Sequence, residues 1–458
     1  MNQPLTQLHR LPVEQTVSGV LEVRLDDGSP VPVVPTETGF AVLIDASGGY
    51  SLSLMRPGGW AAAVARPARA GVSLEADGAS LRVSVSKAVP VMIETPGEAT
   101  VFILAGPPAG EPPAPAGGRL LRFGAGQTHE AGTIQLRAGD VLWLDAGAWL
   151  RGHIVVSKAR GVRIGGRGVL DGSWTAPSGL SARPIILDHC RDVSVEGITL
   201  LRPRHWMVSI GSCEDVRIKD IRQIGDGAGT DGIDIVGSRR VTVRGCFLRN
   251  GDDNIAIKAL DVRRLANSCQ SSFGDFDGNW TGPVEDVLVE GCAFYNDRGG
   301  SAMEIGYETR TDHIRNIVFR DIDVMAVHQF GSVFGIHNGD RAYVENVLYE
   351  DIHVEHHYDK LVDFRVLHSR WNRDERRGCI RNVTLRRIRV NRSIYNEGYT
   401  VSLIGGYNQA HTVEGVTFED FQIDGRPVAS ADALDLHTRH ARGIVFSRRT
   451  LDPSAPKS

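Results

Sequence analysis

The feature that most constrains the fold of this 458-residue chain is a short β-rich unit that recurs along most of its length. Each copy alternates apolar and polar positions on either side of a small or acidic residue, as in VTVRGCFL and VLVEGCAF. The copies begin at Val162, Val193, Val216, Val241, Val287, Ile317, Val347, Val383 and Val416. No helical periodicity separates them, so the pattern predicts a β-solenoid, and a right-handed parallel β-helix fits best. A propeller is disfavoured because its blades need about 40 or more residues at regular spacing.

The first part of the chain, residues 1–117, lies outside this pattern and predicts a separate β domain. Segments such as GFAVLIDA, LRVSVS and ATVFILAG are separated by turn residues, which is typical of an antiparallel sandwich or barrel. The Pro- and Gly-rich run 106–119 predicts a linker. We therefore expect an all-β chain with an N-terminal β-sandwich at 1–117 and a β-helix at 118–458. The first domain is expected to support the second, with carbohydrate binding as the alternative.

Composition and charge exclude several classes of function. The net charge is −4 and no basic run is interleaved with aromatic residues, which disfavours nucleic-acid binding. No stretch of about 20 apolar residues exists, so no membrane span is expected. The start, MNQPLTQLHRLPVEQ, has no apolar core of a secretion signal, which predicts a cytoplasmic protein. The six cysteines show no CxxC pair, so we expect reduced, buried thiols, and we expect no metal and no cofactor.

Two acidic clusters flank one copy of the repeat. Asp231 and Asp234 precede it, and the adjacent pair Asp252–Asp253 follows it. Asp231 and Asp252 are separated by close to one repeat length, so on a solenoid they would stack on neighbouring coils, roughly 5 Å apart. Carboxylates that close resist simultaneous ionisation and hold their pKa values apart, as acid–base hydrolysis requires.

These clusters also carry a family resemblance. TDGIDIVGS (230–238) followed by NGDDNIAIK (250–258) resembles the paired signature of the polygalacturonase-like glycoside hydrolases of family 28, and family 49, the dextranase and isopullulanase group, is similar. GRGVLDGSW (166–174) resembles an early coil of these enzymes, and the likeness covers about residues 120–430. The resemblance implies that Asp252 is the general acid, that Asp231 and Asp253 hold and deprotonate the attacking water, and that the anomeric carbon is inverted.

The alternative interpretation of single aspartates is structural, because Asp at solenoid turns often caps backbone amides. We expect that role for Asp171, Asp234 and Asp321. The sequence also departs from the pectinase pattern. Ser301 stands where a histidine is expected, and Gly335 and His337 replace the arginine and lysine that grip a uronate carboxylate. This predicts a neutral oligo- or polysaccharide as substrate and partner.

Several further side chains are candidates for substrate binding. Lys258 follows the aspartate pair, Glu304 lies near Ser301, and His337 could bind a sugar hydroxyl. Trp206, Trp280 and Tyr307 could stack on sugar rings. The long loop 260–286 is expected beside the cleft, and the insertion 364–380 is expected to wall one end of the groove and favour exo action.

Other functions stay open at this stage. A pectin hydrolase of the polygalacturonase type would keep the same catalytic residues. A lyase, epimerase or intramolecular glycosyl transferase could use the same fold, but lyases and epimerases of uronates need a cation, and no Arg/Lys cluster is evident in the cleft coils. A carbohydrate-binding adhesin would have no need of three carboxylates at this register.

Overall fold

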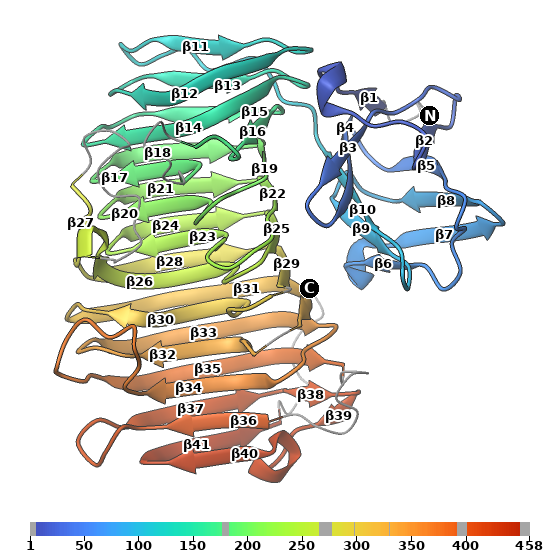
Figure 1. Cartoon of the computed structure of the whole chain (residues 1–458). Coiled ribbons are helices and arrows are strands. Elements are labelled where there is room, and N and C mark those ends of the chain that lie inside the picture. The colour runs from blue at the N-terminus through green and yellow to red at the C-terminus, as the bar shows by residue number, and fades with distance from the viewer. Residues whose placement is uncertain are drawn as a thin grey trace, which may run out of the picture.

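The computed structural model describes residues 6–175, 183–264, 277–296, 298–328, 330–391 and 401–448. Their regular secondary structure is almost entirely β-strand. One sheet of 31 strands forms a stack of coils, and two smaller sheets lie beside it (Figure 1). Strands of successive coils pair in parallel, so the predicted parallel β-helix is confirmed. Its right-handed sense stays a prediction, based on the usual hand of β-crossover connections.

Each coil contributes strands to three faces. The first face contains β14 (Trp149–Ser157), β17 (Ile185–Asp188), β20 (Val208–Gly211), β23 (Ile233–Val236), β26 (Ile255–Asp261), β30 (Met303–Thr309), β32 (Ser332–Asn338), β34 (Lys360–Val366), β36 (Val401–Gly405) and β40 (Leu436–Arg439). The second contains β11 (Leu120–Phe123), β13 (Val141–Leu144), β15 (Arg163–Gly166), β18 (Arg191–Glu196), β21 (Glu214–Lys219), β24 (Arg239–Arg244), β28 (Val284–Glu290), β31 (His313–Val327), β33 (Tyr343–Val354), β35 (Cys379–Val390), β37 (Val413–Glu419) and β41 (Ala441–Ser447).

The third face is built from shorter strands and from the ends of longer ones. It contains β16 (Val169–Asp171), β19 (Thr199–Leu201), β22 (Arg222–Ile224), β25 (Phe247–Asn250), β29 (Ala293–Asn296) and β38 (Gln422–Ile423), joined by the N-terminal parts of β12 (Thr128–Leu136) and β14 and by the C-terminal halves of β31, β33 and β35. The C-terminal part of β12 pairs with β14 on the first face. The short strands β27 (Asn279–Trp280) and β39 (Arg426–Pro427) pair antiparallel.

The sequence repeat corresponds to one row of stacked core residues. Val193, Val216, Val241 and Val287 are direct partners on neighbouring strands, and the row continues through the later repeat starts. The first face has a similar inward row. These rows belong to one core that runs the length of the helix. Stacking buries the apolar face of each coil, which a single coil cannot do alone.

The small or acidic residue at the centre of each repeat is a bend between the second and third faces. Gly197, Gly245, Asp321 and Asp351 occupy this position, all with φ between 51° and 79°. Left-handed backbone favours Gly, Asp and Asn. This explains the composition of the position and places Asp321 at a turn, as expected, but within the described ranges its carboxylate accepts Arg69 Nη2 at 3.2 Å and not a backbone amide.

Five of the six cysteines lie in the described part of the chain. Cys190, Cys213, Cys246, Cys292 and Cys379 are buried free thiols, as expected, and Cys269 lies outside the described residues. The short 3-10 helices are η1 (Val13–Gln15), η2 (Ala68–Ala70), η3 (Val262–Arg264) and η4 (Ala431–Leu434). Among the described residues, no helix has the length and apolar character of a membrane span.

The N-terminal segment forms two sheets that share one core. One sheet has the order β1 (Thr6–Leu8), β4 (Gly39–Ala46), β10 (Thr100–Gly106), β9 (Val91–Glu94) and β6 (Val64–Arg66), with β3 (Val33–Thr36) beside β4. The other has the order β2 (Glu22–Leu25), β5 (Tyr50–Met55), β8 (Ser80–Val85) and β7 (Val72–Asp77). Most pairs are antiparallel, but β4 and β10 are parallel.

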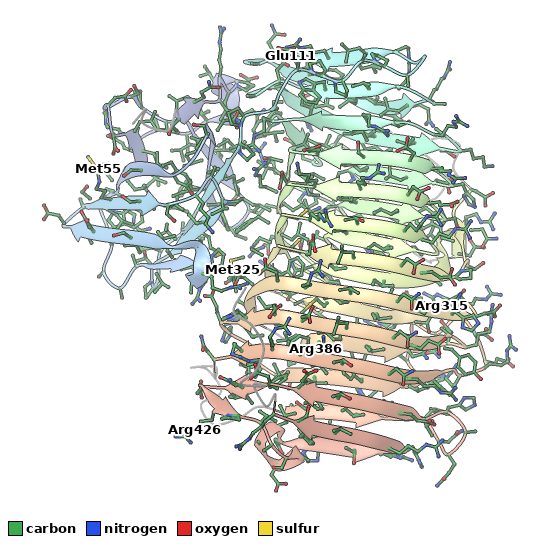
Figure 2. All side chains as sticks on the ribbon, turned by 180° about the vertical axis from the view of Figure 1, so that it is seen from behind. Met55, Glu111, Arg315, Met325, Arg386 and Arg426 are labelled. Atoms are coloured by element: carbon green, nitrogen blue, oxygen red, sulfur yellow. The ribbon has the colours of Figure 1, made fainter. Side chains whose placement is uncertain are left out.

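A second apolar cluster joins these sheets to the third face of the helix. Phe102 and Leu104 pack there with Val169, Phe247 and Met325, and Figure 2 labels Met325 at this junction. A buried ion pair lies nearby, in which Arg167 donates from Nε to Asp45 Oδ1 at 2.6 Å. The N-terminal sheets therefore cover part of the third face.

Candidate active site

The acidic clusters lie at the N-terminal ends of adjacent strands on the first face. Ile233 of β23 pairs with Ile255 of β26, and the N–H of Gly232 donates to the carbonyl of Asp253 at 2.7 Å. This register stacks Asp231 on Asp253 and corrects our expectation that Asp231 stacks directly on Asp252. Asp252 lies one position earlier, where the chain bends into β26.

Lys258 ties the cluster together. Its Nζ donates to Asp231 Oδ2 at 2.7 Å and to Asp234 Oδ1 at 3.0 Å, and it lies 3.9 Å from Asp253 Oδ2. Burial alone would lower the pKa of Lys258, but these carboxylates outweigh it and hold that pKa well above its ordinary value. The turn role expected for Asp234 is wrong, because its carboxylate is fully buried and bound by this lysine.

The Asp252–Asp253 pair is held by backbone donors. Asp252 accepts the N–H of Gly229 at 2.8 Å and that of Asp253 at 3.1 Å. Asp253 Oδ1 accepts the N–H of Ser301 at 2.7 Å, so Ser301 contributes its backbone to the site. In the described part of the chain, no cation lies within ion-pair distance of Asp252.

Burial and crowding keep protons in this cluster. Burial raises the pKa of Asp252 to about 6, and the neighbouring charge of Asp231 adds to the effect. Burial raises the pKa of Asp231 to about 7 against the attraction of Lys258, and that of Asp234 to about 6. The pKa of Asp253 also rises well above its ordinary value, through burial and then the charges of Asp231 and Asp252. Near neutral pH the set can therefore present protonated and ionised carboxyls together.

A second buried network lies on the next coils. His337 Nδ1 is 2.7 Å from Glu304 Oε1, and His337 Nε2 is 3.0 Å from Asp363 Oδ2. The ring of Tyr307 stacks on His337 with centroids 4.4 Å apart. Burial would lower the pKa of His337, but the two carboxylates outweigh it and raise that pKa to about 9. His337 is therefore a cation at neutral pH, and its charge is countered on both sides.

Two members of this network were missed by the sequence. Asp363 and Arg365 lie on β34, where they pair with Gly335 and His337 of β32. Arg365 donates from Nη2 to Asp363 Oδ2 at 2.7 Å. The sequence KLVDFRV (360–366) contains both residues, in a pattern in which charged and apolar positions alternate. Only the strand register shows that they lie next to Gly335 and His337.

The predicted tryptophans have different positions. Trp206 is 7% exposed, and both Lys258 Nζ, at 4.2 Å, and the Arg183 guanidinium, at 4.3 Å, lie over its ring. Trp206 therefore lies beside the carboxylate cluster, where it supports the lysine by a cation–π contact. Its ring offers little free surface for a sugar in this structure.

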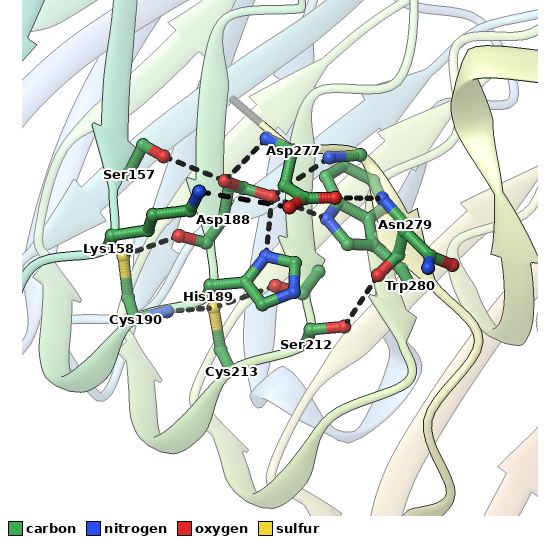
Figure 3. Close-up of polar contacts among 12 residues, drawn as sticks. Ser157, Lys158, Asp188, His189, Cys190, Ser212, Cys213, Asp277, Asn279 and Trp280 are labelled. Carbon is green, nitrogen blue, oxygen red and sulfur yellow. Dashed lines mark hydrogen bonds and ion pairs between the residues drawn. The ribbon is translucent and has the colours of Figure 1, made fainter. Parts of the chain in front are cut away.

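Trp280 does not reach the cluster, and its predicted role as a stacking surface is wrong. Its side chain is fully buried, and its Nε1–H donates to Asp188 Oδ1 at 2.8 Å (Figure 3). The indole occupies the space over Gly211, where an added Cβ would lie 1.8 Å from the ring. Asp188 also accepts the N–H of Asp277, so it anchors the end of the long loop whose residues 265–276 lie outside the described chain.

A hollow of about 740 Å³ continues the first face beyond Arg365. Its lining includes Arg365, His368, Tyr407, His437 and Arg439, and contains no carboxylate. Basic side chains therefore gather on the coils beyond the carboxylate cluster. Among the described residues, no group of three or more His, Cys, Asp and Glu side chains is arranged to hold a metal ion.

A parallel β-helix that carries a cluster of buried carboxylates on one face defines the class of this protein. A sequence model described as "Glycosyl hydrolases family 28" matches residues 130–432, about two thirds of the chain. The chain belongs to this family.

Individual relatives match over shorter stretches. A probable polygalacturonase of Arabidopsis thaliana is 26% identical over 181 residues, covering 37% of this chain and 40% of the relative. A polygalacturonase of Chamaecyparis obtusa is 31% identical over 143 residues, covering 28% and 27%. The chain thus spans less than half the length of either relative.

Two solved structures support the fold alone. Dex49A from Penicillium minioluteum has a TM-score of 0.63 at 13% identity and covers 96% of both chains. An exopolygalacturonase from Thermotoga maritima has a TM-score of 0.51 at 17% identity and covers 72% of this chain and 84% of that one.

Proposed function

We propose that this protein is an inverting glycoside hydrolase in which Asp252 is the general acid, while Asp231 and Asp253 hold the attacking water. The observation that supports this assignment of the acid is the position of Lys258. This lysine contacts Asp231, Asp234 and Asp253, which favours their ionised forms, whereas Asp252 has no such partner among the described residues. Burial raises the pKa values of Asp231, Asp234 and Asp253 as well, so the cluster shares its protons, and we assign the donated proton to Asp252 because no cation among the described residues pairs with it.

The reaction is a single displacement. Asp252 gives its proton to the glycosidic oxygen as the bond from that oxygen to the anomeric carbon breaks. Water attacks the same carbon from the opposite face and gives a proton to Asp231 or Asp253, which leaves the product inverted. An inverting pair needs about 6.5–9.5 Å between acid and base to admit that water. Proton exchange with solvent then restores both carboxyl groups.

A neutral sugar at the cleavage site is the proposed substrate. The His337 imidazolium lies between the carboxylates of Glu304 and Asp363. Because these two carboxylates already neutralise it, it is not available to bind the carboxylate of a uronate. Exo action is part of the proposal. Residues 367–378 are the part of the predicted insertion 364–380 that lies between β34 and β35, and they bind back onto the end of β32: the N–H groups of Arg373 and Asp374 each donate to Asp340 Oδ1 at 2.6 Å.

A second candidate is a hydrolase of acidic polysaccharides of the polygalacturonase type. The observation that favours it is the hollow beyond Arg365, which is lined by Arg365 and Arg439 with two histidines. Guanidinium groups suit planar carboxylates. Both candidates share the same catalytic residues and differ in the charge of the sugar.

The test is to incubate the protein with neutral and uronate oligosaccharides and to follow the anomers of the first products by NMR. We expect hydrolysis of a neutral member with inversion. Cleavage of oligogalacturonates alone would favour the second candidate. Retained configuration would overturn the mechanism, and no cleavage of any member would overturn the hydrolase proposal.

The rate is also expected to depend on pH in a defined direction. Burial raises the pKa of Asp252 to about 6, so kcat should fall as pH rises above that value and the acid loses its proton. The check is a profile of kcat against pH, repeated with an aryl glycoside whose leaving group needs little protonation. With the aryl glycoside, kcat should fall much less at alkaline pH than it does with the ordinary substrate. A kcat that rises through this range on both substrates would contradict the assignment.

For the N-terminal segment we propose a β-sandwich that supports the helix. The two sheets share one core, and the apolar cluster around Phe102 and Met325 covers the third face.

A further inference from the structure

A cavity far from the carboxylate cluster lies between the linker and the second face of the helix. Its volume is about 530 Å³, within the range of about 300–1,000 Å³ of small-molecule sites. One wall is the linker from Pro107 to Pro113, and the other is formed by β13, β15, β18 and β21. Figure 2 labels Glu111 of this linker at the N-terminal end of the stack. The active-site residues lie on the first face, so this cavity is separate from them.

Trp143 forms the apolar part of the cavity wall. It lies on β13 opposite Gly165 of β15, and its side chain is half-buried. A Cβ added at Gly165 would lie 2.8 Å from Cζ3 of the indole, so the ring extends across the glycine of the next coil. Among the described residues, the indole N–H of Trp143 has no hydrogen-bond partner, in contrast to Trp149 and Trp280.

The charged side chains around this ring are paired. Lys219 Nζ is 2.8 Å from Glu196 Oε1 and 3.5 Å from Asp220 Oδ2. Arg163 Nη2 is 2.9 Å from Asp192 Oδ2. An aromatic ring surrounded by paired polar groups offers an apolar surface and many donors and acceptors, but no free charge. Such a wall suits a neutral ligand with many hydroxyl groups rather than an anion.

We propose that this cavity is a second carbohydrate site, in which a pyranose of a neutral polysaccharide packs against Trp143 and its hydroxyl groups bind the Glu196–Lys219 pair. The site holds a polymer on the second face of the helix while another part of the chain, or another molecule, occupies the first face. This inference does not depend on the reaction proposed above.

The test is affinity electrophoresis of the whole protein in gels that contain dextran, pullulan, galactan or polygalacturonate. We expect retardation by at least one neutral polymer, and Trp143→Ala should weaken it roughly three- to tenfold, the cost of one aromatic contact. Trp143→Phe should restore part of the binding. Gly165→Leu should weaken it as well, because the new side chain occupies the place of the ring.

The matched control is Tyr343→Ala, which removes an aromatic side chain, 43% exposed, from the same face several coils away. It should bind as wild type does. The circular dichroism and thermal unfolding of each variant report on the fold, so the test remains valid if no hydrolysis is found. Wild-type binding by Trp143→Ala, an equal loss in Tyr343→Ala, retention only by polygalacturonate, or no retardation by any polymer would overturn the proposal.

Discussion

Asp252→Asn is expected to lower kcat by a factor of about 10²–10⁴, because it removes the proton donor for the leaving group. The change should affect kcat far more than KM, since the proton is transferred in the transition state. An aryl glycoside with a good leaving group should recover much of the lost rate. The measurement is steady-state kinetics on both kinds of substrate.

The matched control is Asp312→Asn, which changes a carboxyl whose side chain is 75% exposed on the same helix. It should retain wild-type kinetics. Thermal unfolding of Asp252→Asn is also needed, because Asp252 accepts two backbone N–H groups and asparagine can accept only one of them. Full activity in a folded Asp252→Asn protein would remove the assignment of the acid.

Lys258→Met is expected to lower the free energy of unfolding by about 3–5 kcal/mol near pH 8, because it leaves buried carboxylates without their cation. The pKa values of Asp231 and Asp234, already raised to about 7 and about 6 by burial, should rise further without the lysine. A carboxyl whose pKa is higher in the folded than in the unfolded protein stabilises the fold while it is protonated. This stabilisation is complete at pH values below the pKa of the unfolded state, and it is lost as the pH rises through the pKa of the folded state. The loss in Lys258→Met should therefore shrink or reverse near pH 4, where the carboxyls of the wild-type protein are protonated.

The measurement is urea unfolding followed by circular dichroism at the two pH values. Lys158→Met is the control, because Lys158 is 66% exposed and its nearest carboxylate, that of Asp277, is 3.8 Å away. It should change the free energy of unfolding by less than about 1 kcal/mol. An equal loss at both pH values would show that Lys258 acts through packing and not through the carboxylates.

The helix could be predicted from the sequence because its information is local and repeated. Val193, Val216 and Val241 begin successive copies, and the structure pairs these same residues in one row. The bend positions were recognisable because left-handed backbone restricts them to a few residue types. The N-terminal strands lack such a repeat, so their pairing order, including the parallel contact of β4 with β10, could not be predicted.

The site was only partly predictable. The aspartate signature located the cluster, but Asp234 was assigned to a turn and Trp280 to a sugar surface. In both cases the side chain is buried where the sequence predicted exposure, because burial depends on which residues of other coils cover a strand. Lys258 covers Asp234, and Gly211 on a neighbouring coil makes room for Trp280. Asp363 and Arg365 were missed because they are more than 100 residues from the signature and reach it only through the stack.

The sequence by itself determined the coil, its bends and the position of the carboxylate cluster, because each follows from patterns within one or two repeats. The tertiary structure decided the register and the charge balance. A shift of one residue pairs Asp231 with Asp253 and leaves Asp252 as the carboxyl that Lys258 does not contact. The proposed assignment of the acid rests on that contact pattern, because the carboxyls share their protons and the fold decides which of them Lys258 pairs with.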